Sequence, residues 1–201
     1  MISAATNCMA CGAAMASDAI YCSNCATARE DPNTRALFVV DGTTGLFNDA
    51  FTGALVDHET SRAIRYRRPL TVLVAMVDHA DFITQDLGDA SRNLFRELAD
   101  VIAGSVRDID TVGYLGDRFC LVLPETDQAG AVVAAEKLMH TVASHQYLDG
   151  GQWGRVTISV GAASVGYDRM DKQDLVELAT QALLEGRGDG SNRVHVAHRA
   201  N

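Results

Sequence analysis

Long hydrophobic runs are missing from this 201-residue sequence. Leu70 to Val77 is the longest strongly apolar stretch and has the length of a β-strand, whereas a membrane-spanning helix needs roughly 18 or more apolar residues. Residues Met1 to Asn7 contain neither the basic segment nor the apolar core of a signal peptide. We therefore expect a cytoplasmic protein without a membrane partner.

Positive charge is also scarce. The chain has 17 Lys and Arg residues against 26 Asp and Glu residues, which gives a net charge of −9. Nucleic acids and anionic membranes attract proteins mainly through Lys and Arg side chains. The charge therefore excludes broad affinity for either partner and predicts that nucleic acid is not bound, while it leaves room for a local basic pocket that binds a nucleotide.

Cysteine is almost absent beyond residue 25, where Cys120 stands alone in an apolar run. The other four form two Cys-x2-Cys pairs separated by ten residues: Cys8, Cys11, Cys22 and Cys25. This spacing is typical of four thiolates around a tetrahedral zinc ion. Because so short a segment cannot fold by apolar burial alone, we predict a structural zinc ion at these cysteines. A redox pair or two disulfides are the alternatives, which a reducing cytoplasm disfavours.

Residues 8 to 25 resemble the short zinc ribbons found at the ends of many prokaryotic regulators. Arg29 is the one basic residue among residues 1–30, so contact with a protein partner is favoured over contact with nucleic acid. We predict a zinc ribbon over residues 1–30, a linker over residues 31–37, and one main domain over residues 38–201.

The main domain alternates helical and strand-like patterns. Helical spacing of apolar residues predicts helices over Phe47 to Arg67, Ala90 to Val106, Gln128 to Ser144 and Lys172 to Glu185. Apolar runs predict strands over Leu70 to Val77, Arg155 to Ala163 and Asn192 to Ala197, with a two-strand hairpin around Gly116. Strands that alternate with helices indicate an α/β fold.

Three segments of this domain carry a family resemblance: Asp41 to Asn48, Val112 to Thr126, and Val156 to Ala162. Together they resemble the GGDEF domain of diguanylate cyclases over about residues 38 to 197. The resemblance implies a largely antiparallel sheet flanked by helices, in the arrangement shared with class III nucleotide cyclases. It also implies an active site that condenses two GTP molecules into cyclic di-GMP with the help of Mg²⁺.

The signature turn departs from the family pattern. It reads Leu115-Gly116-Asp117-Arg118-Phe119, with Arg118 in place of an acid. The resemblance assigns Asp78 and Asp117 to the metal site, Gly116 to close approach of the nucleotide, and Arg187 to a phosphate contact. A guanidinium group only donates hydrogen bonds and repels a dication, so we expect this degenerate site to bind no Mg²⁺ and to have no cyclase activity.

A second family site looks better preserved. Arg107 and Asp110 match the Arg-x-x-Asp motif of the inhibitory site that binds cyclic di-GMP, and Lys137 falls where the family often has another basic residue. Arg107 and Lys137 would contact guanine or phosphate, and Asp110 would accept from guanine N–H donors. The alternative is a solvated ion pair between Arg107 and Asp110 that binds no ligand.

These patterns support three functions. The first is a non-catalytic GGDEF-like regulatory protein that senses cyclic di-GMP, or less readily GTP held by Arg118, and is coupled to a protein partner through the zinc ribbon. The second is a protein-interaction scaffold that needs no ligand. The third is an atypical diguanylate cyclase that makes cyclic di-GMP from GTP.

Overall fold

The computed structural model describes residues 6–8, 13–15, 24, 39–147, 155–165, 175–186 and 190–197. Its main feature is a five-stranded sheet with the order β4-β5-β3-β6-β7. The strands are β3 (Leu70–Val77), β4 (Thr111–Tyr114), β5 (Phe119–Pro124), β6 (Ile158–Val165) and β7 (Val194–Val196). Neighbouring strands are antiparallel except for β6 and β7, which are parallel. The α/β fold and the largely antiparallel sheet are confirmed.

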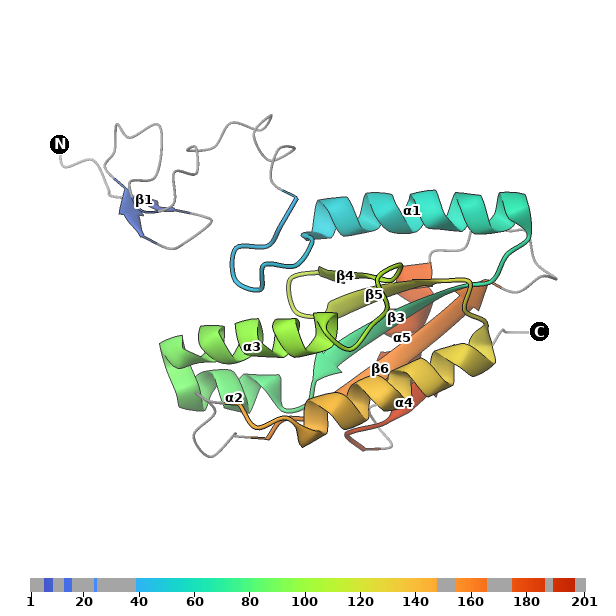
Figure 1. The fold of residues 1–201 in the computed structure, drawn as a ribbon. Helices are drawn as coiled ribbons and strands as arrows, with labels where there is room; N and C mark the ends of the chain where they lie inside the picture. Colours follow the sequence, from blue (N-terminus) through green and yellow to red (C-terminus); the bar gives the residue numbers. More distant parts are fainter. Residues whose placement is uncertain are drawn as a thin grey trace.

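Helices cover both faces of this sheet (Figure 1). They are α1 (Asp49–Tyr66), α2 (Ala80–Leu87), α3 (Ser91–Ala103), α4 (Gln128–Ser144) and α5 (Leu175–Gly186), with a short 3₁₀ turn, η2 (Gly88–Ala90), between α2 and α3. One core cluster joins the sheet to α3 and α4, and the other joins it to α1 and α5.

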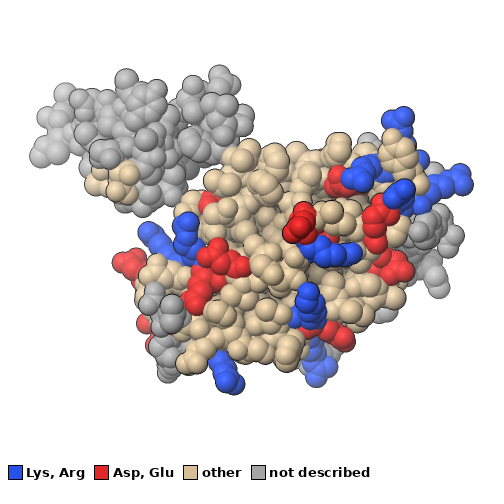
Figure 2. Space-filling model, in the orientation of Figure 1, with Lys and Arg blue, Asp and Glu red and all other residues tan. Residues whose placement is uncertain are grey.

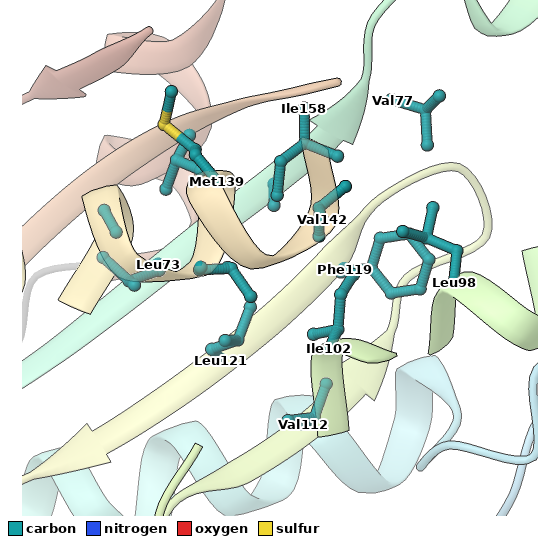
Figure 3. Packing of buried hydrophobic residues seen from close by; sticks show 14 of the residues in the cluster. Leu73, Val77, Leu98, Ile102, Val112, Phe119, Leu121, Met139, Val142 and Ile158 are labelled. Atoms are coloured by element: carbon teal, nitrogen blue, oxygen red, sulfur yellow. The ribbon is translucent and has the colours of Figure 1, made fainter. Parts of the chain in front are cut away.

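The alternation of side chains along the central strands explains the two cores. Leu73 and Leu121 belong to the cluster beneath α3 and α4, where Figure 3 shows them beside Met139 and Val142 of α4. Val72 and other intervening residues point to the opposite face and pack in the α1 and α5 cluster. A strand buried on both faces reads as a continuous apolar run, which is the pattern of β3.

Gly161 lets α5 pack closely on β6. A Cβ atom at this position would lie 2.0 Å from the carbonyl oxygen of Ala179 and 2.8 Å from Leu183. Any side chain here would force α5 away from the sheet, so the glycine is required by contact between the helix and the strand.

Most predicted elements are present, with shifted ends. The predicted helix that ends at Val106 stops at Ala103, where Gly104 is the C-cap, and the strand predicted from Arg155 begins at Ile158. The sequence patterns miss α2 altogether. They also miss a small antiparallel hairpin near the N-terminus, formed by β1 (Thr6–Asn7) and β2 (Ala14–Met15).

Charged side chains of both signs are interspersed over the face drawn in Figure 2, with basic groups gathered over the C-terminal end of α1. Two of these arginines have acidic partners: Arg62 contacts Glu59 at 3.0 Å, and Arg68 contacts Glu125 at 2.8 Å. They thus form part of a solvated, paired surface. None of the described helices is long and apolar enough to cross a membrane.

Candidate functional site

The signature turn joins β4 to β5 at one end of the sheet. Tyr114 is the last residue of β4 and Phe119 the first of β5, and the backbone N–H of Leu115 donates to the carbonyl oxygen of Arg118 at 2.8 Å to close the turn. Gly116 has a φ angle of +85°, in the left-handed region that glycine adopts without steric cost. The turn therefore keeps a hairpin geometry despite its altered sequence.

Arg118 binds the acidic residue next to it. Its Nε donates to Oδ1 of Asp117 at 2.7 Å, and its Nη2 donates to Oδ2 at 3.0 Å. This two-pronged hydrogen bond raises the pKa of Arg118, against the opposing effect of partial burial. Both oxygens of Asp117 are thus engaged by a cation within the turn.

Tyr114 lies close to the same acids. Burial raises the pKa of its hydroxyl group, and the carboxylates of Asp41 and Asp117 raise it further. Asp41 is itself engaged, because its Oδ1 accepts from the backbone N–H of Thr44 at 2.8 Å and from the Thr44 hydroxyl at 2.8 Å. The carboxylates of Asp41 and Asp117 therefore accept hydrogen bonds from groups of the protein itself.

Asp78 is at the same end of the sheet, since β3 and β5 are antiparallel with Ala75 opposite Phe119. Its side chain is buried, with 4% of the residue exposed. Oδ1 accepts from the Ser159 hydroxyl at 2.7 Å. Oδ2 accepts from the Thr157 hydroxyl at 2.6 Å and from the backbone N–H of Asn192 at 2.9 Å.

These three donors tie the end of β3 to β6 and to the segment before β7. A carboxylate has about four lone-pair positions, so most of those of Asp78 are occupied. Asp78 thus connects three segments of the chain through hydrogen bonds. Among the described residues there is no group of three or more His, Cys, Asp or Glu side chains that could hold a metal ion.

The second predicted site lies at the other end of β4. Arg107 and Asp110 form a tight turn in which Oδ2 of Asp110 accepts from the Arg107 backbone N–H at 3.0 Å and from its Nε at 3.3 Å. The two side chains differ in exposure, at 57% for Arg107 and 4% for Asp110. The acidic member of the pair is therefore buried, whereas its basic member is exposed to solvent.

Oδ1 of Asp110 is buried and has no hydrogen-bond partner among the described residues. Such an oxygen is costly, since a buried polar group without a partner typically destabilises a protein by about 1–3 kcal/mol, and more if it is charged. Buried unpaired groups are rare and often mark a ligand, water or catalytic site. Asp110 is therefore the most informative acid in the structure.

Lys137 lies across the same space. Its Nζ donates to the Ser105 carbonyl oxygen at 3.2 Å, and Nη2 of Arg107 donates to the Thr126 hydroxyl at 2.8 Å. Arg107, Asp110 and Lys137 all line one hollow of about 330 Å³ between α4, the loop after α3, and the sheet. The structure thus brings the three predicted residues together, and it adds Ser105 and Thr126, which the sequence analysis does not identify.

Other predicted site residues lie outside the described part of the chain. They are Arg187 of the phosphate site and three of the four predicted zinc ligands, Cys11, Cys22 and Cys25. The fourth, Cys8, is buried, with 4% exposed, and follows β1. Its backbone N–H donates to the Ala13 carbonyl oxygen at 2.8 Å, so the chain reverses direction between these two residues.

The sequence profile described as "Diguanylate cyclase, GGDEF domain" matches residues 38–193. The chain belongs to the GGDEF family. This membership accounts for the sheet order and for the hairpin that carries the signature turn. The match begins at residue 38, and the structure describes the main domain from residue 39 onward.

Individual GGDEF proteins match over the same region. Diguanylate cyclase A of Treponema denticola is 30% identical over 130 residues, which are 64% of this chain and 35% of that protein. The response regulator PleD of Caulobacter vibrioides is 28% identical over 162 residues, covering 79% of this chain and 36% of that protein. The matched region therefore spans about a third of each relative's length.

Solved structures support the same fold. The GGDEF domain of DgcB from Caulobacter crescentus, determined in complex with c-di-GMP, superposes with a TM-score of 0.70 and 22% identity. The match covers 84% of this chain and 98% of the DgcB domain. At this level of identity the likeness establishes the fold of the GGDEF domain alone.

Proposed function

We propose that this chain is a regulatory GGDEF protein that binds cyclic di-GMP at Arg107, Asp110 and Lys137 and does not convert GTP. The proposal places the chain in cyclic di-GMP signalling, because its relatives include a diguanylate cyclase and a GGDEF domain determined in complex with c-di-GMP. The observation that carries it is that Asp110, which has a buried carboxylate oxygen without a partner among the described residues, lines the same hollow as two basic side chains.

The chemistry of cyclic di-GMP fits these groups. Guanine offers N1–H and N2–H donors, which suit the unpaired Oδ1 of Asp110, and the phosphates suit the guanidinium of Arg107 and the ammonium of Lys137. Guanidinium binds phosphate or a guanine edge through paired hydrogen bonds. One ligand would thus supply the missing donor and neutralise both cations.

The charged groups beyond the C-terminal end of β4 support the proposal that GTP is not converted. GTP condensation needs a divalent metal to offset charge on the phosphates, whereas Arg118 brings a positive charge to the turn and pairs with Asp117. At about 5 Å and an effective dielectric constant of about 20, a repulsive unit-charge pair costs roughly 3 kcal/mol. The three hydrogen bonds that Asp78 accepts from neutral donors support the same proposal, because they occupy most acceptor positions of the second expected ligand.

Calorimetric titration of the full zinc-loaded chain with cyclic di-GMP tests the binding function. We expect binding by the wild type and a loss of about 10- to 100-fold in affinity for Arg107→Ala, since one paired contact to guanine contributes roughly 1–3 kcal/mol. Arg62→Ala is the matched control, because Arg62 is an exposed arginine on α1, beyond the opposite face of the sheet. Its affinity should equal that of the wild type.

Two results would contradict the proposal. Absence of binding by the wild type, in calorimetry and in a second assay, would leave a ligand-independent scaffold as the better description. Formation of cyclic di-GMP from GTP and Mg²⁺, measured by chromatography of the reaction mixture, would instead identify an atypical cyclase.

We also propose that Cys8, Cys11, Cys22 and Cys25 bind a structural zinc ion and that the resulting ribbon contacts a protein partner. The place of Cys8 supports this, because it is buried directly after β1 in the hairpin of β1 and β2. Four thiolates would satisfy the zinc ion and leave it no open coordination position, so its contribution would be to folding.

Metal analysis of protein purified without added zinc tests the ribbon. We expect one zinc ion per chain, and loss of that ion in Cys8→Ser. Cys120→Ser changes a cysteine buried in β5 and should keep the metal, which makes it the control. Zinc-free wild-type protein with all thiols titratable would contradict the proposal.

A further inference from the structure

Thr126, just before α4, contacts the guanidinium group of Arg107. Its hydroxyl oxygen accepts from Nη2 of Arg107 at 2.8 Å, and the hydroxyl group donates to the Pro124 carbonyl oxygen at 3.1 Å. Because a threonine hydroxyl has a single proton, the bond to Pro124 leaves it only as an acceptor for Arg107. Thr126 is 5% exposed and is not one of the described residues that line the hollow. An effect of Thr126 on a ligand would therefore pass through Arg107.

The backbone around Thr126 is fixed on both sides. Its carbonyl oxygen accepts from the Thr71 hydroxyl of β3 at 2.9 Å, and the next residue, Asp127, caps the first turn of α4. The preceding residue, Glu125, has a φ angle of +56°, in the left-handed region that residues other than glycine rarely adopt. Its carboxylate pairs with Arg68 at 2.8 Å. These contacts give the hydroxyl group of Thr126 a defined position.

The guanidinium group of Arg107 is held along one edge. Its Nε donates to Oδ2 of Asp110 at 3.3 Å and its Nη2 donates to Thr126 at 2.8 Å, so both nitrogens of the lateral edge have acceptors within the protein. No described residue accepts from Nη1. The end-on edge, formed by Nη1 and the second proton of Nη2, is therefore the pair of donors that a phosphate or a guanine edge can engage.

We infer that Thr126 is a positioning residue, which orients Arg107 so that the end-on edge of its guanidinium group meets cyclic di-GMP. This rests on the proposed binding of cyclic di-GMP and deepens it. The side chain of Arg107 is 57% exposed, so without a second contact it would sample many rotamers, and the ligand would have to order it. A side chain that the protein already holds loses less conformational entropy on binding.

Thr126→Val tests this role because it removes the hydroxyl group and keeps a side chain of similar shape. By calorimetry on the full chain we expect cyclic di-GMP affinity to fall about five- to tenfold, whereas Thr126→Ser, which keeps the hydroxyl group, should bind within about twofold of the wild type. Thr52→Val is the matched control, since Thr52 is also buried and donates to a backbone carbonyl oxygen, that of Asn48 at 2.7 Å, but lies on α1. Its affinity should equal that of the wild type.

A double-mutant cycle separates positioning from a general structural effect. If Thr126 acts through Arg107, Thr126→Val should not weaken binding further in the Arg107→Ala background. Equal losses in the wild-type and Arg107→Ala backgrounds would overturn the inference, because Thr126 would then affect the ligand without Arg107.

The side-chain resonances of Arg107 give a readout that needs no ligand. In the free wild type, the hydrogen bond to Thr126 should slow rotation about the Cζ–Nη2 bond. Nuclear magnetic resonance at low temperature should then resolve separate Nη2 proton signals, assigned by their loss in Arg107→Ala, and Thr126→Val should merge them.

The outcomes distinguish the two proposals. Unchanged affinity and unchanged Arg107 signals in Thr126→Val would overturn positioning by Thr126 and leave the proposed function standing. No binding of cyclic di-GMP by the wild type would overturn the proposed function, and with it the role of Thr126 in binding, even if the Arg107 signals respond to Thr126→Val.

Discussion

The acidic residues near the two ends of β4 differ in how fully the protein satisfies their hydrogen bonds. Beyond its C-terminal end, Asp117 is held by Arg118, and nearby Asp78 accepts three hydrogen bonds from the protein. Before its N-terminal end, Asp110 keeps one buried oxygen without a partner among the described residues. An acid that the protein itself has satisfied gains little from a ligand, whereas an unsatisfied one gains a full hydrogen bond.

This difference concerns which of the two family sites is expected to bind a ligand. The chain keeps the GGDEF fold over residues 38–193, yet the acids that the family resemblance assigns to metal are engaged by protein donors. The charged groups assigned to cyclic di-GMP include an acceptor without a partner among the described residues, and they line a hollow. Ligand binding by this chain is therefore expected where the internal hydrogen bonding is incomplete.

Asp78→Ala should have the largest effect of the variants at the turn end. It removes three hydrogen bonds to a buried carboxylate, so we expect unfolding to become easier by about 3 kcal/mol, measured by urea denaturation. Asp57→Ala, at an exposed acid of α1, should change stability by less than about 0.5 kcal/mol.

The effect of Mg²⁺ on the melting temperature tests whether Asp78 ligates metal. If Asp78 is structural, 10-fold changes in Mg²⁺ concentration should not shift the melting temperature of the wild type or of Asp78→Ala. A shift that occurs in the wild type and disappears in the variant would show that Asp78 still ligates metal, and the contrast between the two ends of β4 would fail.

Arg118→Glu should have an intermediate effect. The change replaces a repulsive charge near the expected metal position by an attractive one, so we expect Mg²⁺ affinity to rise by at least about tenfold, or about 1.4 kcal/mol, by calorimetry. We expect no cyclic di-GMP from GTP, because Asp78 remains buried and hydrogen-bonded.

Arg118→Gln controls for loss of the ion pair alone, since it removes the positive charge without adding a negative one. Its Mg²⁺ affinity should fall between those of the wild type and Arg118→Glu. Product formation by the glutamate variant would mean that Arg118 is the main obstacle to catalysis and that the hydrogen bonds of Asp78 are not.

Part of the fold could be predicted from the sequence. The limits of β3 follow from Pro69 and Asp78, which flank a continuous apolar run. Helix α4 begins and ends where the sequence predicts, and the side chain of Asp127 caps its first turn. By contrast, α2 has eight residues and a single buried one, Ile83, which is too short for helical periodicity to stand out.

The candidate site also has some contacts that the sequence predicts and others that it does not. The pairing of Arg107 with Asp110 is predictable from their spacing of three residues. The partners of Asp78 are not, because Thr157 and Ser159 lie about eighty residues further along the chain, at separations of 79 and 81. The hollow also depends on residues of separate elements, which only the folded chain brings together.

Tyr114 gives the smallest and most local test of the turn end. Burial and the charges of Asp41 and Asp117 raise its pKa above the usual tyrosine value of 10.0. A group whose pKa is raised on folding contributes stability that is complete below the pKa of the unfolded chain and is lost as the pH rises through the folded pKa. Stability should therefore decline above about pH 10, and less so in Tyr114→Phe.

Asp117→Asn then separates the causes. Removing this negative charge should lower the pKa of Tyr114, measured by ultraviolet absorbance against a Tyr114→Phe reference, but should leave it above 10.0 because burial is the larger cause. An unchanged pKa would mean that Arg118 already cancels the charge of Asp117 at the tyrosine. That outcome would strengthen the description of the turn as a neutral pair and would further weaken the case for a metal there.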